Sequence, residues 1–321
     1  MSARVIAIIP AFHRPQLLAR ALRSLAGQGP LLARVVVVNN SSDAETARLT
    51  AESRVPATLL DYGCNLGTAG GIAAGMAAML QDLRATHAFV MDDDACATPD
   101  LISTMLRAAE ESKAEAVAPL ITDGSGTIRW FPGPLAQPAW NVVRRSPTPA
   151  EFLRQCGPAP LEWNWAIWAA VLFSRRAIEA VGYPRMDLWS QSTDLEYTLR
   201  VSARFKCVLA PAAVCQHLPP PAPDGGEGKK LFLGLQSGNY ISFRLRHGWR
   251  FIRHIPGQHY RYLRHYRWRL RAWKEAAVAL VGGAVLGRTP GNTARRADYL
   301  RAVEKFPEGK AGAGGERRRA G

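Results

Sequence analysis

Residues 5–91 alternate apolar runs with segments of helical spacing, and this rhythm limits the fold more than any other feature of the chain. Short runs rich in β-branched residues predict strands that are buried on both faces. Apolar residues then recur at helical spacing over residues 17–25, and Gly27 to Pro30 ends that helix. The predicted strands are residues 5–9, 35–38, 58–60 and 88–91. This alternation predicts a parallel sheet flanked by helices, with ligands at the carboxyl ends of the strands.

Three consecutive aspartates, Asp92, Asp93 and Asp94, follow the fourth predicted strand. Adjacent carboxylates repel one another unless something positive binds there, and a divalent cation with oxygen ligands is the natural partner. In an extended chain Asp92 and Asp94 point to the same side, so both can reach one ion. Such a cation commonly brings phosphate with it. The triplet could instead be a solvated acidic turn, and the residues alone leave both readings open.

Two further segments are candidates for substrate binding. Residues 63–71 form a Gly-rich turn before a helix, where backbone amides can approach an anion closely, although tight helix packing would also explain the glycines. In residues 187–200, Thr193 or Asp194 can cap a helix whose first turn carries Glu196. Asp194 is then either a helix cap or a general base that deprotonates a hydroxyl.

His217 ends a short stretch just before a proline-rich segment. A lone histidine is more often structural than a ligand. This one could complete a metal site with Asp92 and Asp94, because imidazole plus carboxylates suits Mn²⁺ and is less suited to Mg²⁺.

The formal net charge of +15 predicts an anionic partner, such as lipid headgroups, nucleic acid or a phosphorylated substrate. The five cysteines form no CxxC pair and are odd in number, so we expect reduced thiols in a cytosolic protein rather than disulfides. No signal peptide is visible, and the best apolar stretch, residues 276–286, is too short to span a bilayer. We therefore expect a soluble or peripheral protein.

The prolines and glycines of residues 219–226 indicate a domain boundary. We expect an α/β domain before it, mixed α+β in its second half, and a basic, aromatic-rich helical region after it. The predicted ranges are 1–220 for the first domain, 221–230 for the linker, 231–305 for the helical region and 306–321 for a disordered tail.

In their order along the chain, these motifs resemble those of family 2 glycosyltransferases with the GT-A fold, over roughly residues 4–220. The matching pieces are Ile8 to Pro15, Val37 to Ser42, Asn65 to Gly67 with Ala69-Gly70-Gly71, Met91 to Asp94, Asp194 to Tyr197 with Arg200, and His217. The triple Asp with the Ala-Gly-Gly turn is most similar to the galactofuranosyltransferase and rhamnosyltransferase branches. The resemblance implies an α/β fold, a Rossmann-like mixed sheet flanked by helices, here with a basic helical C-terminal extension.

The resemblance also implies a role for individual residues. Asp194 would be the catalytic base, and Trp189 and Glu196 would shape the acceptor pocket. Mn²⁺ or Mg²⁺ would be bound by Asp92, Asp94 and His217. The donor would contact Pro10, Phe12, Arg14, Asn39, Asn65, Gly67, Asp92 and Asp93. The family often carries Asp where this chain has Asn39; an amide can still hydrogen-bond a pyrimidine, so the choice between uracil and thymine stays open.

The implied activity is the inverting transfer of a sugar from a UDP- or dTDP-sugar, with a galactofuranose- or rhamnose-type donor favoured. The acceptor would be a hydroxyl of a glycan or lipid-linked sugar in cell-envelope polysaccharide synthesis. A dication would neutralise the departing nucleoside diphosphate while Asp194 removes the acceptor proton. Because one displacement inverts the anomeric configuration, no protein nucleophile is needed.

From Phe243 to Lys274, arginines interleave with aromatic residues. Treated as one helix, this region predicts an apolar side opposite Arg261, Arg264 and Arg271. The residues on that side are Leu263, Tyr266, Leu270, Trp273 and Ala277. Such a pattern is typical of interfacial helices, so we expect an enzyme bound peripherally to the anionic inner face of the cytoplasmic membrane. Packing on the core is the alternative, and nucleic-acid binding is the least favoured.

Two other classes of function compete with the transferase. One is a catalytically silent module of the same fold that binds polyanions or membranes through its basic half. The other is a nucleotidyltransferase, which would need a Gly-rich loop with a basic residue after the first strand. Residues 10–15 do not supply those glycines.

Overall fold

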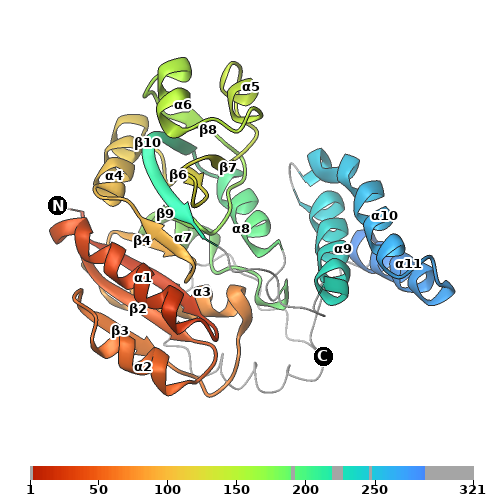
Figure 1. The fold of residues 1–321 in the computed structure, drawn as a ribbon, viewed down its shortest axis with the longest axis horizontal. Helices are drawn as coiled ribbons and strands as arrows, with labels where there is room; N and C mark the ends of the chain where they lie inside the picture. Colours follow the sequence, from red (N-terminus) through yellow and green to blue (C-terminus); the bar gives the residue numbers. More distant parts are fainter. Residues whose placement is uncertain (1–2, 189–191, 219–226, 246–247, 286–321) are drawn as a thin grey trace.

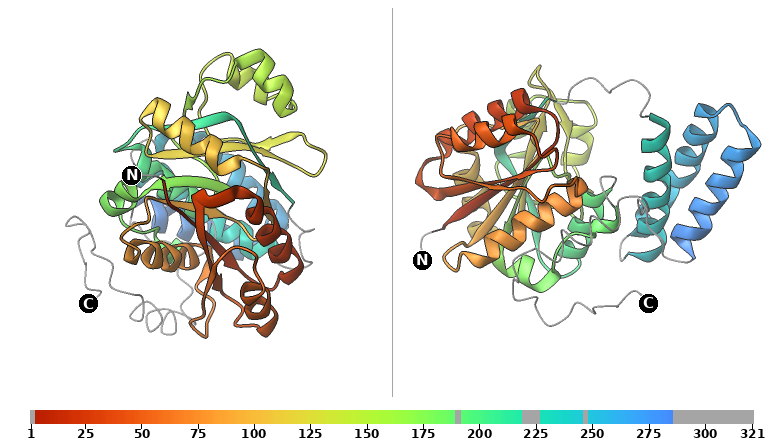
Figure 2. Two further views of the ribbon diagram at one scale, coloured as in Figure 1. Left: turned by 90° about the vertical axis from the view of Figure 1, so that its left-hand side faces the viewer. Right: turned by 90° about the horizontal axis from the view of Figure 1, so that it is seen from below.

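A computed structural model describes residues 3–188, 192–218, 227–245 and 248–285. A mixed sheet flanked by helices makes up the part before residue 219, and the C-terminal helices lie together on one side of it (Figures 1 and 2). Residues 221–226 of the predicted linker (221–230) and the predicted tail at 306–321 lie outside the described residues.

The first part of the chain has the predicted alternation of strands and helices. Its elements are β1 (Val5–Ala11), α1 (Pro15–Leu25), the 3₁₀ helix η1 (Ala26–Leu31), β2 (Leu32–Asn39), α2 (Ala44–Ala51), β3 (Ala57–Leu60), α3 (Gly67–Gln81) and β4 (His87–Met91). One boundary differs: α3 already begins at Gly67, so the expected turn over residues 63–71 is too long. Strands β3, β2, β1 and β4 are neighbours and run parallel, as predicted.

The second part adds strands that make the sheet mixed. They are β5 (Ala95–Ala97), β6 (Ala116–Thr122), β7 (Ile128–Trp130), β8 (Leu161–Glu162), β9 (Ala170–Ser174) and β10 (Cys207–His217). The strand order is β3-β2-β1-β4-β9-β6-β10-β5, with β7 beside β6 and β8 beside β10. β9 is antiparallel to β4 and β6, whereas β6 and β10 are parallel.

The sheet is buried on both faces, as the continuous apolar strands predicted. Val5, Ala7 and Ile9 pack with α1 and with α4 (Leu101–Ser112), while Ile6 and Ile8 face the opposite core, which includes α3. The remaining elements of this part are α5 (Ala139–Val143), α6 (Pro149–Cys156), α7 (Arg175–Val181), η2 (Met186–Leu188) and α8 (Thr193–Ser202).

The C-terminal region is helical but not as one amphipathic helix. Its elements are α9 (Glu227–Arg244), η3 (Gly248–His254), α10 (Ile255–His265) and α11 (Leu270–Ala284). α9 begins inside the predicted linker. The single helix expected through Lys274 is wrong, because Arg267 and Trp268 have left-handed backbone angles (φ 50° and 59°) that end α10.

This break changes which side chains are buried. Leu263 is buried against α9, but Leu270 and Trp273, expected on the same side, are exposed. Small residues of α11 pack inward instead; they are Ala272, Ala276 and Ala279.

Two sequence expectations concern the chain as a whole. All five cysteines are free thiols, so the structure contains no disulfide between them. Among the described residues, no helix combines the length and the apolar character that crossing a bilayer requires.

Candidate functional site

The acidic triplet and His217 meet because β10 pairs with β5 immediately after the triplet. The antiparallel register places His217 opposite Ala95, and the Leu218 N–H donates to the carbonyl of Asp94 at 2.9 Å. β10 reaches this position after an irregularity in its pairing with β6, between Ala210 and Val214. Such irregularities re-aim a strand near a site. The register thus joins two segments that are 123 residues apart in sequence.

Asp92, Asp94 and His217 form a three-residue cluster that could hold a cation, as their ligand atoms all lie within 4.8 Å of one another. His217 Nε2 lies 3.0 Å from Asp94 Oδ1 and 4.0 Å from Asp92 Oδ2. Asp94 Oδ1 is buried and, among the described residues, has no hydrogen-bond donor other than the His217 imidazole that it faces, so a cation could take its place between these two groups. Two carboxylates and an imidazole are a donor set that suits Mn²⁺.

Burial and neighbouring charges shift the pKa values of all three cluster residues. Burial and the charge of Asp94 raise the pKa of Asp92 above its ordinary value. Burial opposes charge on Asp94 and on His217 alike, but their mutual contact prevails: it lowers the pKa of Asp94 and raises that of His217. A bound dication would favour the ionised carboxylates and the neutral imidazole.

Arg14 pairs with the acidic triplet. Its Nη1 lies 2.6 Å from Asp94 Oδ2 and 3.1 Å from Asp93 Oδ1. Asp93 also accepts the Phe12 N–H at 3.2 Å, and its burial raises its pKa to about 6. The loop after β1 is therefore tied to the triplet, and Arg14 contacts carboxylates where the resemblance implied a place beside a base. Phe12 is 40% exposed and can offer a ring face.

Asn39, at the end of β2, is almost fully buried and its amide is engaged. The amide NH₂ donates to the Asp43 carbonyl and to Asp61 Oδ2, at 3.0 and 3.1 Å, and the amide oxygen accepts from Ser41. Asp61 itself is exposed and was not singled out from the sequence, where it is an isolated acid after β3. The carboxylate missing at position 39 is thus present next to it, just after the neighbouring strand β3.

The start of α3 is fixed by two asparagines. Asn65 Oδ1 accepts the Gly67 N–H at 2.8 Å, and Asn40 bonds to the Leu66 N–H and the Gly67 carbonyl, both at 3.2 Å. Gly67 has φ +68°, which favours glycine. Asn40 was another residue missed from the sequence, since its role depends on a contact with a distant segment.

The next glycines serve close packing of α3 on β1. A Cβ at Gly71 would lie 2.8 Å from Pro10 Cβ, and one at Gly75 would lie 2.2 Å from Ile8 Cγ2. Pro10 is buried at this contact. The packing explanation of the Gly-rich run therefore holds for its later part, leaving Asn65 and Gly67 as the residues at the helix N-terminus.

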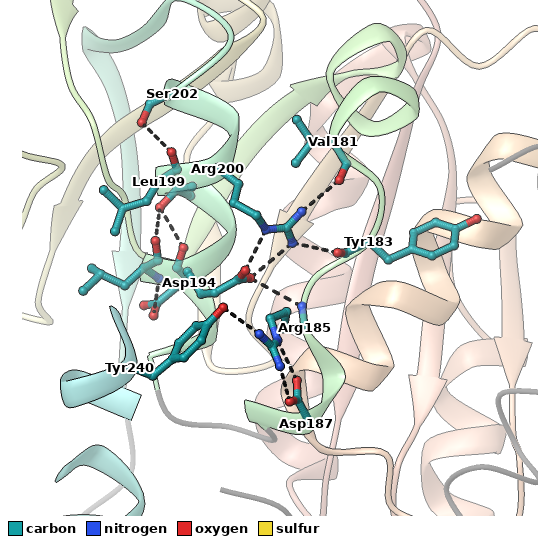
Figure 3. Close-up of polar contacts among 12 residues, drawn as sticks. Val181, Tyr183, Arg185, Asp187, Asp194, Leu199, Arg200, Ser202 and Tyr240 are labelled. Atoms are coloured by element: carbon teal, nitrogen blue, oxygen red, sulfur yellow. Dashed lines mark hydrogen bonds and ion pairs between the residues drawn. The ribbon is translucent and has the colours of Figure 1, made fainter. Parts of the chain in front are cut away.

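Asp194 lies in the first turn of α8 and is one of the residues drawn in Figure 3. The N-cap is Ser192, so neither Thr193 nor Asp194 caps the helix as predicted; Asp194 accepts only the next N–H, that of Leu195, at 2.8 Å. Burial raises the pKa of Asp194 to about 6. Its charge also contributes to raising the pKa of Asp92, which places the two carboxylates within electrostatic reach of each other.

Glu196 is fully buried and both its oxygens have partners. Arg200 Nε lies 2.6 Å from one oxygen, and the other accepts from Arg200 Nη2 and from the Arg185 N–H. Arg200 also donates to the carbonyls of Val181 and Tyr183, each at 2.8 Å. Glu196 thus holds the segment that leads toward Asp194 and does not face an open pocket. Trp189, the other predicted acceptor residue, lies outside the described residues.

Comparison with known proteins agrees with the geometry. Residues 6–163 match the Glycosyl transferase family 2. Over 204 residues the chain is 27% identical to galactofuranosyltransferase GlfT1 of Mycobacterium tuberculosis (strain CDC 1551 / Oshkosh), an alignment that covers 63% of this chain and 65% of that protein. The chain therefore spans a little less than two thirds of the length of this relative.

Two solved structures resemble the fold. The S. aureus TarS fragment 1–349 gives a TM-score of 0.56 at 12% identity, covering 95% of this chain and 90% of that one. The mannosyltransferase PcManGT from Pyrobaculum calidifontis, in complex with GDP-Man and Mn²⁺, gives a TM-score of 0.51 at 18% identity, covering 95% of this chain and 82% of that one. These similarities confirm the expected GT-A fold.

Proposed function

Because residues 6–163 match the Glycosyl transferase family 2 and the chain has the GT-A fold, we propose that it is an inverting transferase that moves a sugar from a nucleotide donor to a hydroxyl group. The observation that carries the proposal is the β10–β5 register, which brings His217 to Asp92 and Asp94. A separate carboxylate, Asp194, lies within electrostatic reach of this cluster. A cation site beside an independent base is the arrangement that such a transfer needs.

Asp92, Asp94 and His217 would hold a divalent cation, with Mn²⁺ favoured over Mg²⁺ by the imidazole. When bound, the cation supplies positive charge that stabilises a departing diphosphate. Asp94 is the central ligand, because Arg14 and His217 approach its two different oxygens and fix its orientation. PcManGT carries Mn²⁺ with its nucleotide sugar, which supports a metal requirement here.

Asp194 would act as the general base on the acceptor hydroxyl. With a pKa of about 6 it is ionised at neutral pH, and it is a stronger base than an ordinary aspartate. Its backbone hydrogen bond to Leu195 leaves the second oxygen free of protein hydrogen bonds among the described residues. That oxygen is the one we assign to the acceptor proton.

The donor would lie across the carboxyl ends of β1, β2 and β3. Phe12 offers an exposed ring for the base, and the Asn39–Asp61 pair offers an amide and an exposed carboxylate for its polar edge. Asn65 and Gly67, at the N-terminus of α3, would face the ribose and diphosphate. A UDP-sugar of galactofuranose type is the donor that the relative's name supports, and dTDP-rhamnose is the alternative.

The acceptor would be a glycan or lipid-linked sugar of the cell envelope, reached at an anionic membrane. Three aromatic side chains support the membrane partner: Tyr260, Trp268 and Trp273 are each about half exposed. The ring centres of Tyr260 and Trp268 lie 5.7 Å apart, and those of Trp268 and Trp273 lie 5.9 Å apart. Further apolar residues of α11 are also exposed; they are Leu270, Val278 and Val281. Clustered exposed apolar area of this kind typically indicates a binding surface.

The charges around the aromatic cluster favour anionic lipid. Residues 251–285 contain seven Arg and Lys and a single acid, Glu275. Among the described residues, only Arg271 of these cations pairs with that acid. The exposed cations without an ion pair to a described residue are Arg253, Arg261, Arg264, Arg267, Arg269 and Lys274. Aromatic rings beside unpaired arginines match the headgroup region of a bilayer.

The catalytic proposal is tested with a panel of UDP-galactofuranose, UDP-hexoses and dTDP-rhamnose in the presence of Mn²⁺, measuring release of nucleoside diphosphate. We expect turnover with one donor class, abolished by Asp94→Asn and by Asp194→Asn. Asp100→Asn is the matched control, since Asp100 is exposed and its left-handed backbone also suits asparagine. A silent binding module would show polyanion or vesicle binding with no turnover for any donor.

The membrane partner is tested by sedimentation with phosphatidylglycerol and phosphatidylcholine vesicles. We expect binding to the anionic vesicles only, weakened about 30-fold by Arg261→Ala with Arg264→Ala, since each cation contributes about 1 kcal/mol. Trp268→Ser with Trp273→Ser should also weaken binding, whereas Arg107→Ala, an exposed arginine of α4, should not. Tighter binding to RNA than to vesicles, or loss of a dimer in the tryptophan variant, would overturn the membrane assignment.

A further inference from the structure

α9 packs directly against the elements that carry the proposed base. Leu188 of η2 and Leu199 of α8 share an apolar cluster with Tyr240 and Ile241 of α9. Farther along, the rings of Trp165 and Phe251 meet at 6.1 Å. The C-terminal region is thus in contact with the acceptor side of the transferase domain.

Arg185 makes the polar connection across this contact (Figure 3). Its guanidinium donates to both oxygens of Asp187, at 3.0 and 2.6 Å, and to the Tyr240 hydroxyl at 2.6 Å. The same guanidinium lies over the Tyr240 ring, 4.7 Å from its centre. Tyr240 therefore holds Arg185 through both its hydroxyl and its ring, and it is itself largely buried.

Arg185 also links this contact to α8, the helix that carries Asp194. Its backbone N–H donates to Glu196 of α8 at 3.4 Å, and η2 follows directly at residues 186–188. The chain then passes through residues 189–191 to α8, where Asp194 lies. The Arg185–Leu188 turn, which precedes Asp194 in the chain, is thus held by Glu196 of α8 and by Tyr240 of α9.

We infer that Tyr240 is a positioning residue for acceptor transfer: by holding Arg185, the C-terminal region sets the place of the Arg185–Leu188 turn and hence of Asp194. This inference rests on the proposed function of Asp194. The donor side is formed by β1, β2, β3 and α3. η2 also lies against α3, but the start of α3 is fixed by Asn40 and Asn65, and neither bonds to Arg185 or Tyr240 among the described polar contacts. The contact should therefore affect acceptor kinetics and leave donor binding unchanged.

The test is Tyr240→Phe, which removes the hydroxyl and keeps the ring, with Tyr262→Phe as the matched control: Tyr262 is a buried tyrosine of α10 whose hydroxyl donates to Glu275 within the C-terminal helices. Kinetics are measured per folded molecule, counted by the stoichiometry of UDP binding in the presence of Mn²⁺. For Tyr240→Phe we expect kcat/KM for the acceptor to fall about 10-fold, with donor KM and the Kd for UDP unchanged. Hydrogen exchange should also rise at residues 186–188 and 192–196. Tyr262→Phe should change none of these.

A purely structural tyrosine would lower the unfolding midpoint and leave acceptor kinetics per folded molecule unchanged, which would overturn the inference. A parallel rise in donor KM would overturn it too, since the effect would then not be confined to the acceptor side. Arg185→Lys gives a second check: it keeps the charge but cannot bridge Asp187 and Tyr240 together, and it should reproduce the acceptor defect. If the wild-type protein turns over no donor, both the proposed function and this inference fail; if it does and Tyr240→Phe matches it, only the inference fails.

Discussion

The ion pair between Glu196 and Arg200 gives the sharpest prediction for stability. Glu196 is fully buried, and Arg200 is its charged partner as well as the donor to two backbone carbonyls. Arg200→Ala would leave the carboxylate buried without a counter-charge and the two carbonyls without a donor. Removing one partner of a buried pair costs about 3 to 5 kcal/mol, a large part of the stability of a typical domain.

Arg48 is the matched control. It also pairs with a glutamate one helical turn away, Glu52, and with Glu45, but all three side chains are about half exposed. Exposed pairs of this kind contribute little, so Arg48→Ala should hardly change the free energy of unfolding. The two substitutions delete the same side chain from the same kind of helical pair and differ mainly in burial.

Urea unfolding followed by tryptophan fluorescence measures the difference. With a slope of about 3 kcal/mol/M, Arg200→Ala should lower the midpoint by roughly 1 to 2 M. Adding Glu196→Gln to Arg200→Ala should recover part of the loss, because an unpaired amide costs less to bury than an unpaired charge. Equal midpoint shifts for Arg200→Ala and Arg48→Ala, or no recovery in the double variant, would refute the reasoning.

Three further predictions concern the site and its support. The acceptor transfer rate should rise with pH through about 6 and then level off, because Asp194 with its raised pKa is protonated and inactive as a base below that value; a rate that is flat from pH 5 to 7 would contradict this. Mn²⁺ at 100 times its Kd should stabilise the protein by about 2.7 kcal/mol in thermal unfolding. EDTA or Asp94→Asn should remove that gain, and a gain that survives in Asp94→Asn would exclude the cluster as the site. Gly75→Ala should destabilise by about 1 to 3 kcal/mol because its methyl overlaps a β1 side chain, whereas Gly27→Ala, with nothing within 4 Å, should be tolerated.

The first sheet strands were predictable because their signal is local. A continuous apolar run such as Val35 to Val38 has few alternatives to a buried strand, and β2 contains it. The break at Arg267 and Trp268 was not predictable in this way. Left-handed backbone is usually marked by glycine or asparagine, and here two residues with no such preference adopt it at the turn between α10 and α11.

In the candidate site, too, residues with a local signal were predictable and residues placed by distant contacts were not. The carboxylates of the triplet could be placed at the end of a strand from their neighbours alone. The meeting with His217 was predicted from the chemistry of an imidazole with two carboxylates and from the family resemblance, but the β10–β5 pairing that produces it has no local signal. Asp61 and Tyr240 were missed because each gains its partner, Asn39 or Arg185, from a segment distant in sequence. Periodicity carries no information about such pairs.

The register of β10 against β5 limits how many residues the chain can have just before His217. Side chains on a strand alternate between faces, so inserting or deleting a single residue between Val214 and His217 would turn the imidazole to the far side of the sheet. The carboxylates would stay where they are, and the fold could survive intact. A variant altered in this way would have the parent's folding signals in spectroscopy but would lack one of the three ligands. We therefore expect natural insertions and deletions to lie outside Val214 to His217.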